Sequence, residues 1–273
     1  MVDLTSGETD SHHAHHAIKF RGGGFAPVAI NSISVLFFVV LIGVWQMASS
    51  LGWVSPLFLP SPLRIIDALK DLVVSGELTQ HVTASLGRIG AGWALGATAG
   101  VIFGGLIGLY SGWRSVGVPF IAAMFPIPKI ALLPLFILWL GIGEASKVAI
   151  IALGVFYPIA IGAYAGVDNV ARTLIRMGQS FNMPFSHIVF KIVAPGALPS
   201  ILSAVRISTS IALILMVAAE MIGADKGLGT YLMSAGNLMQ TDKLMAGIVV
   251  VAAIGLCISA VLTIIERKLL AWR

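Results

Sequence analysis

The stretch DNVARTLIRMGQSFNMPFSHIVFKIVAPGALP, residues 168–199, decides the fold of this chain because it is a long polar interruption between apolar segments of membrane length. Its first part, about 170–180, predicts a short amphipathic helix that carries Arg172 and Arg176. A second short helix is expected after a turn. Two such helices between membrane spans form a shape suited to docking against another protein rather than to catalysis.

The turn between these helices falls at Phe181–Met183. Asn182 suits its centre because Asn is the non-glycine residue that most readily takes left-handed backbone. Pro184 suits the first position of the second helix, where its missing N–H costs no hydrogen bond. We expect that helix to end near residue 193, because Pro195 and Pro199 favour extended backbone before the next apolar run.

Composition places the whole chain in the membrane. Of its 273 residues, 58% are hydrophobic and 11% are charged, whereas soluble domains carry roughly 25% charged residues. We therefore expect an all-α integral membrane protein. The net charge of +5 follows the expected topology and does not indicate a nucleic-acid partner. The one cysteine, Cys257, excludes an intrachain disulfide.

Residues 1–27 are polar, and we expect a disordered cytoplasmic tail before one membrane domain over 28–273. Within the tail, the run HHAHH could bind a transition metal weakly, but a disordered tail is favoured because no acid or cysteine completes a site of defined geometry. Its histidines are His12, His13, His15 and His16.

Six spans are expected, since about 20 apolar residues cross a bilayer. They are 28–50, 82–110, 118–141, 146–167, 197–223 and 244–265. An even number puts both termini on one side, and the loops on that side carry nine Lys and Arg against five on the other, which predicts cytoplasmic termini. The nine are Lys19, Arg21, Arg114, Arg172, Arg176, Lys191, Arg267, Lys268 and Arg273, and the five are Arg64, Lys70, Lys147, Lys226 and Lys243.

Between the first two spans, Ser61 before Pro62 is typical of a helix start. The apolar residues that follow recur with helical spacing. We expect an amphipathic helix on the outer membrane surface.

The second span carries a glycine at every fourth position, which makes one smooth face where another backbone can approach closely. The sequence leaves open whether that partner is in the same subunit or in a dimer. The glycines are Gly92, Gly96, Gly100, Gly104 and Gly108.

The third span contains Pro126, Pro128 and Pro134, which predict a broken helix. Broken backbone at membrane depth is tolerated where protein or a water-filled cavity satisfies the freed groups. This segment is therefore a candidate lining of a translocation pathway. Lys129 lies between the first two prolines and the third. It is the best candidate for contacting a transported anion, and a structural ion pair is the competing interpretation.

Three further charges lie within spans: Arg88, Arg206 and Glu220. Such charges cost several kcal/mol in lipid and are expected to find partners. Arg88 and Arg206 lie near span ends, where snorkelling is an equal alternative. Glu220 lies about 21 Å along the helix from Arg206, so these two are not expected to pair. Glu220 is a candidate for closing a gate or for capping the following loop, with a role in packing as the competing interpretation.

No nucleotide or catalytic motif appears in the sequence. The chain has no GxxxxGK[ST] run, no zinc spacing and no nucleophile elbow. We expect no catalytic residue and no cofactor in this chain.

Five segments together resemble the permeases of the nitrate/sulfonate/taurine branch of ABC importers. They occur in the order of that family and cover most of the chain from residue 55 onward. They are SPLFLPSP (55–62), SLGRIGAGW (85–93), PIPKIALLPLFILWLGIGEASK (126–147), APGALPSILSAVRIS (194–208) and VAAEMIGADKGLG (217–229).

The resemblance implies a six-span type I importer permease in a bacterial inner membrane, working as a homodimer. Two separate ABC ATPase subunits would hold ATP and Mg, and a periplasmic or lipid-anchored solute-binding protein would deliver the solute.

The resemblance also implies that the stretch at 168–199 contains the coupling helix that contacts the ATPase. The family consensus there is Glu-Ala-Ala followed by Gly. Aligned on Pro195, the consensus acid falls on Arg176 and the glycine on Asn182, so the ion pair of the family acid does not carry over. The implied coupling residues are Arg176, Gly178, Phe181, Asn182, Met183, Pro184, Phe185, Ser186 and His187.

By the same resemblance, the transported solute is expected to be a small anion such as a sulfonate, taurine or nitrate. Import of an aromatic acid or a vitamin precursor by the same architecture is an alternative. A secondary transporter or channel is a weaker one, because it would need no docking loop and the sequence has no inverted repeat.

Overall fold

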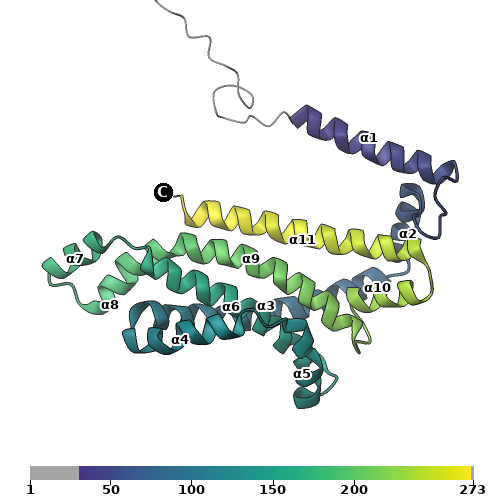
Figure 1. Cartoon of the computed structure of the whole chain (residues 1–273). Coiled ribbons are helices and arrows are strands. Elements are labelled where there is room, and N and C mark those ends of the chain that lie inside the picture. The colour runs from purple at the N-terminus through teal and green to yellow at the C-terminus, as the bar shows by residue number, and fades with distance from the viewer. Residues whose placement is uncertain (1–30, 272–273) are drawn as a thin grey trace, which may run out of the picture.

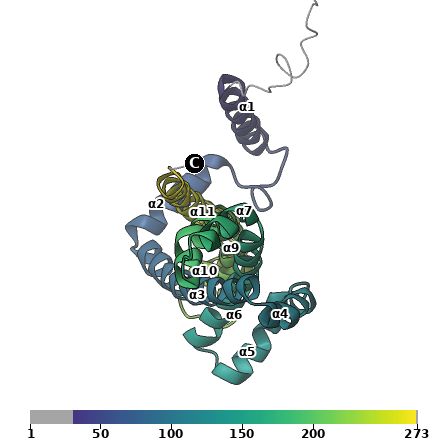
Figure 2. The ribbon, with the colours of Figure 1, turned by 90° about the vertical axis from the view of Figure 1, so that its left-hand side faces the viewer.

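The computed structural model describes residues 31–271, and every regular element in that range is a helix. The tail at 1–27 and its histidines lie outside the described residues. Three long helices form the centre: α3 (Glu77–Leu109), α6 (Glu144–Asp168) and α9 (Ala194–Met221). They lie side by side, with α6 packed against both others (Figures 1 and 2).

Glycines set the close distance between α3 and α6. A Cβ added at Gly92 would lie 2.7 Å from the side chain of Ile151, and one added at Gly100 would lie 2.8 Å from the backbone oxygen of Phe156. The other three members of the four-residue ladder also face α6. The ladder is therefore a contact within the subunit, which answers the question that the sequence left open. Those three members are Gly96, Gly104 and Gly108.

Small residues bring α6 against α9 in the same way. A Cβ at Gly166 would lie 2.8 Å from the backbone oxygen of Ala197, and one at Gly162 would lie 3.1 Å from that of Ser200. Large apolar side chains fill the remaining space between the three helices. The fully buried ones are Ile150, Ile151, Val155 and Ile159 on α6 and Met216 on α9.

The expected amphipathic helix after Ser61 is present as α2 (Pro62–Val74). The Ser61 hydroxyl accepts a hydrogen bond from the Arg64 backbone N–H at 3.4 Å, which caps the helix. Its buried face packs against α11 (Thr241–Leu269) near Ala246. The first apolar helix, α1 (Asn31–Ser50), lies apart from the bundle and reaches it through α2 (Figure 1).

The expected third span, 118–141, is broken as its prolines predicted, but its limits were wrong. It consists of α4 (Ser111–Met124), a 3-10 turn (Lys129–Leu132) and α5 (Leu133–Leu140), with a bend of 90° between the two parts. Proline cannot donate a hydrogen bond, and Pro128 adopts extended backbone with ψ 107°. The first part begins seven residues earlier than expected because Tyr110, in extended backbone, ends α3 directly before Ser111.

The sequence suggested that the second helix of the polar stretch ends before Pro195. In the structure, the helical run continues past this residue. Short α8 (Phe185–Ile188) continues through a π-helical turn (Val189–Val193) into α9, and one apolar helical run extends over Phe185–Met221. The wider π turn accommodates Pro195, since the backbone just before this proline has already left the regular α-helical hydrogen-bond pattern.

Within the described residues, four helices are long and apolar enough to cross a membrane, or five if the bent pair counts as one span. They are α3, α6, the run Phe185–Met221 and α11. The apolar part of α1, Val35–Ser50, is shorter. The all-helical membrane architecture is thus confirmed, and the count of six spans stays a prediction.

The glycine contact between α3 and α6 is testable with neighbouring residues. Gly104→Ala would push a methyl group into the backbone oxygen of Ala160, whereas a methyl group at Gly105 meets open space. We expect Gly104→Ala to lower the melting midpoint of the detergent-solubilised protein, at a cost of about 1–3 kcal/mol. Gly105→Ala should melt no lower than the wild type. Equal melting of the two variants would contradict the contact.

Candidate functional site

The polar stretch forms a helix–turn–helix at one end of the bundle, which we call the loop end (Figure 1). Its helices are α7 (Arg172–Ser180) and α8. The Asn182 N–H donates to the Gln179 carbonyl at 2.9 Å, and the Met183 N–H donates to the Gly178 carbonyl at 3.0 Å. This pair of bonds closes a Schellman motif. Asn182 has φ 51°, so the expected left-handed turn is confirmed.

Gly178 is buried where α7 crosses the following helix. A Cβ there would lie 3.0 Å from the Ile192 side chain and 3.5 Å from the sulfur of Met183. Pro184 has ψ 150° and precedes α8, so it is the N-cap rather than the first helical residue. The extended proline directs the chain from the turn into α8.

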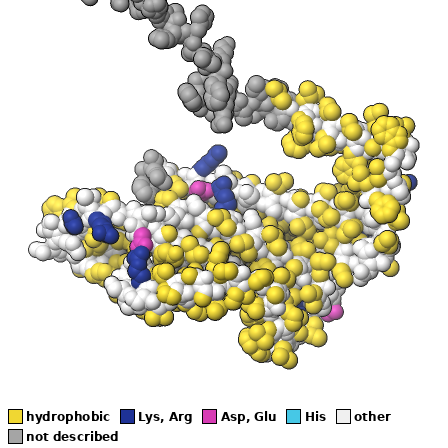
Figure 3. Space-filling model, in the orientation of Figure 1, with side chains coloured by type: hydrophobic (Ala, Val, Ile, Leu, Met, Phe, Trp, Pro, Cys, Tyr) yellow, Lys and Arg dark blue, Asp and Glu magenta, His cyan; other side chains and the backbone are white. Residues whose placement is uncertain are grey.

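The outer surface of this turn is apolar and exposed. Phe181 is 76% exposed, and Met177, Phe185 and Phe190 are also exposed. Lys and Arg side chains gather at the same end (Figure 3). Of the predicted coupling residues, Gly178 and Met183 lie inside the loop and support it. The exposed ones are Arg176, Phe181, Asn182, Pro184, Phe185, Ser186 and His187.

The loop is fixed to the bundle by packing, and an ion pair joins two bundle helices beside it. Val170, Ile188 and Val193 form a buried cluster against the ends of α3 and α6. The Phe185 ring lies 6.1 Å from that of Tyr110. The guanidinium of Arg114 donates to both carboxylate oxygens of Asp168, tying the start of α4 to the end of α6.

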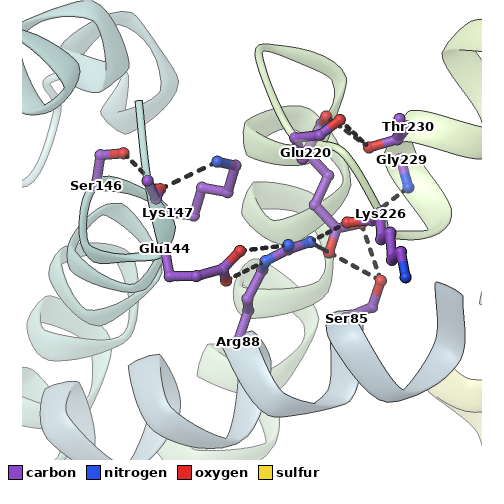
Figure 4. A network of polar contacts seen from close by, with 12 residues as sticks. Ser85, Arg88, Glu144, Ser146, Lys147, Glu220, Lys226, Gly229 and Thr230 are labelled. Atoms are coloured by element: carbon purple, nitrogen blue, oxygen red, sulfur yellow. Dashed lines mark hydrogen bonds and ion pairs between the residues drawn. The ribbon is translucent and has the colours of Figure 1, made fainter. Parts of the chain in front are cut away.

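The opposite end of the bundle holds a polar network centred on Arg88 (Figure 4). Arg88 donates two bonds of 2.6 Å to Glu144 and one of 2.6 Å to Glu220, and it also reaches the Lys226 carbonyl at 2.7 Å. Its side chain is 6% exposed, and that of Glu220 is completely buried. The suggestion that Arg88 snorkels to the membrane surface was wrong, because two carboxylates hold it inside.

Glu220 accepts from the start of α10 (Leu228–Asn237), in line with the interpretation that it caps the segment after its own helix. Its carboxylate accepts a bond of 2.9 Å from the Gly229 N–H, where a negative charge complements the helix dipole. Ser85 accepts from the Leu228 N–H at 2.9 Å and donates to the same carboxylate. Gly227, at φ 145°, leaves no room for a side chain beside Glu220 and Arg88.

Sequence reasoning missed Lys147, which it counted as an outer-loop charge. Lys147 is buried, and its ammonium donates to the carbonyls of Ile142, Gly143 and Gly223 at 3.0–3.1 Å. It thereby ties the start of α6 to the end of α9. Its position one helical turn after Glu144 was the available signal, since that spacing places both side chains on one face of the helix.

The residues predicted for a pathway do not come together in one site. Lys129 donates to the carbonyls of Met124 and Phe125, at the end of α4, and its ammonium lies 4.8 Å from the centre of the Tyr157 ring. Arg206 donates to Glu266 on α11 at 2.5 Å. Arg206, near the middle of α9, and Glu220, at its end, have different partners, as their spacing predicted.

A cavity of about 440 Å³ opens at the network end, between α2, α3, α10 and α11. Its lining includes three carboxylates, from Asp71, Glu77 and Asp225, against one ammonium, from Lys243. Burial raises the pKa of the Tyr231 phenol in its wall above the ordinary value. This charge balance makes the cavity unsuited to holding an anion.

Residues 96–271 match the family of binding-protein-dependent transport system inner membrane components. The chain belongs to this family. It is 37% identical to the taurine transport system permease protein TauC of Escherichia coli over 250 residues, 88% of this chain and 90% of TauC. It is also 37% identical to SsuC of Bacillus subtilis, named for aliphatic sulfonate transport, over 86% of this chain and 85% of SsuC. The resemblance to sulfonate and taurine ABC permeases is thus confirmed.

The turn of this permease is testable without its partners. Asn182→Val should destabilise the turn, because a β-branched residue resists left-handed backbone, at a cost of about 1–2 kcal/mol. A cost of that size raises the opened population roughly tenfold, so trypsin should cut faster after Arg172 and Arg176. Asn182→Gly should be cut at the wild-type rate. Equal cutting of the two variants would contradict the role of the left-handed residue.

The two carboxylates around Arg88 provide a matched pair for a second test. Glu220→Gln leaves part of a buried guanidinium charge uncompensated and should cost about 3–5 kcal/mol. Glu144→Gln should cost less, because the Glu144 side chain is 67% exposed and water can replace it. Thermal melting in detergent measures both. A larger loss for Glu144→Gln would show that the buried pair is not the main connection.

Proposed function

We propose that this permease is the membrane subunit of an ATP-driven importer that moves a small anionic solute of the sulfonate, taurine or nitrate type from a periplasmic binding protein into the cytoplasm. Transport proceeds by alternating access. The observation that carries the proposal is the apolar tip around Phe181, which is exposed although the turn beneath it is fixed by two backbone bonds.

A fixed apolar tip supports the role of an ATPase contact. Aromatic side chains contribute much of the binding energy at protein interfaces when they enter a pocket of the partner. Phe181 lies in the Schellman turn, and Phe185 begins the helix that follows it. Both residues therefore lose little conformational freedom on binding. The basic residues near them suit an acidic rim on the ATPase. Each of two permease copies would seat this loop on one ATPase subunit, where ATP and Mg are held.

In this proposal, the loop end and both termini lie in the cytoplasm, and the network end lies at the outer membrane surface. A solute-binding protein then docks at the network end, where α2 and α10 lie. The acidic cavity beside these helices suits contact with basic side chains of that protein better than it suits holding the solute.

The proposed substrate class rests on the relatives, two of which are named for taurine and for aliphatic sulfonates. Lys129, beside the break between α4 and α5, remains the candidate for meeting the anion, with Pro126 and Pro128 shaping the break. Its present carbonyl partners would exchange for the solute during transport. Import of an aromatic acid or a vitamin precursor would use the same architecture.

The test co-expresses the chain with its neighbouring ATPase and binding-protein genes and compares two exposed phenylalanines. Phe181 at the loop end and Phe58 at the network end are both 76% exposed. Phe181→Asp should reduce the ATPase recovered with the permease by at least roughly tenfold, as expected for a central interface residue. Phe58→Asp should recover the wild-type amount.

The same complex in vesicles identifies the solute. ATP hydrolysis is measured against sulfonates, taurine, nitrate, aromatic carboxylates and vitamin precursors, with and without the binding protein. Stimulation by a sulfonate or taurine only with the binding protein supports the proposal, and stimulation by another class replaces the substrate. If no ATPase co-purifies with the wild-type permease, the result would instead favour a secondary transporter or channel.

A further inference from the structure

The apolar surface of α11 ends abruptly near its C-terminus. From Leu244 to Ile265 the helix is apolar, and Glu266, Arg267 and Lys268 follow directly. Side chains such as Ile264 and Ile265 are exposed on the subunit surface. This change from apolar to charged residues marks the depth at which the hydrocarbon meets the lipid headgroups.

Arg206 of α9 lies at the same depth, although it is in the middle of a long apolar helical run. Its Nη2 donates to Glu266 at 2.5 Å and to the Thr263 hydroxyl at 3.3 Å. Among the described residues, the guanidinium bonds its partners through Nη2 alone, which leaves the donors on Nη1 and Nε for a further acceptor. The Arg206 side chain is half exposed, so a molecule outside the subunit reaches it.

These residues line a groove of about 430 Å³ between α9 and α11. Two guanidinium groups and one carboxylate face it, which gives a net charge of +1. Arginine is suited to phosphate because its planar donors match two phosphate oxygens at once. The lining residues are Arg206, Thr263, Glu266, Arg267 and Leu270.

We propose that this groove binds the headgroup phosphate of an anionic phospholipid. The acyl chains lie along the exposed apolar surface of α11 next to the charged lining, where Ile264 is adjacent and Leu256 lies about three turns before Arg267 on the same side of the helix. A soluble anion would use the guanidinium groups but not this adjoining face. The site is at the end of the bundle that carries the polar loop, and it is independent of which solute is transported.

The test counts lipid bound to the purified protein by native mass spectrometry, with phosphatidylglycerol and phosphatidylcholine offered together. Arg267→Gln should lower the phosphatidylglycerol-bound fraction by about fivefold, the effect of one basic residue near an anionic headgroup. The control is Lys268→Gln, which removes the same charge from the next residue without altering the lining of the groove. It should bind within about twofold of the wild type.

Because Arg206→Gln leaves Glu266 without its ion-pair partner, the second variant is Arg206→Gln with Glu266→Gln, which preserves the net charge. It should also lose phosphatidylglycerol. Equal losses for Arg267→Gln and Lys268→Gln would overturn the proposal in favour of diffuse surface attraction. Equal binding of phosphatidylcholine would overturn it as well. Displacement of the lipid by millimolar inorganic phosphate would show a site for soluble anions instead.

Discussion

Apolar helices gain little by leaving lipid for one another, because lipid tails are as apolar as the side chains. The centre of this permease therefore depends on how closely α3 can approach the backbone of α6. The glycine ladder allows that approach, and Gly162 and Gly166 repeat it on the face of α6 toward α9. The exposed large side chains lie on the outside of this three-helix unit, where they face lipid or another subunit.

Close packing leaves the two ends of the unit to be fixed by polar groups. At the network end, Arg88 joins α3 to α6 through Glu144 and to α9 through Glu220, and Lys147 ties α6 to the end of α9. A buried ion pair is weak evidence for net stability, but its geometry is specific. It fixes how the helices meet and where α10 begins. At the loop end, the Arg114–Asp168 pair has the corresponding role.

Features that depend on neighbouring residues were predictable from the sequence. The helix–turn–helix, the left-handed Asn182, the surface helix after Ser61 and the break near Pro128 follow from local backbone chemistry. Interactions between distant segments were not. Ser85 and Glu220 are 135 residues apart, and no local pattern pairs them. The continuation of α8 past Pro195 was missed because a π turn depends on tertiary packing, which overrides the local preference of proline.

The position of the π turn bears on how a push on the loop would act. It lies between α8, which carries the exposed phenylalanines, and α9, which is locked to α6 and α3. Such single π turns inside helices are frequently found at functional sites. Val193 within this turn packs into the same buried cluster as Ile188 of α8. Loop and bundle are thus held together across the π turn. Under the proposed function, movement of an ATPase would tilt the three-helix unit as one body, and the 90° break between α4 and α5 is the place where the chain can take up the difference.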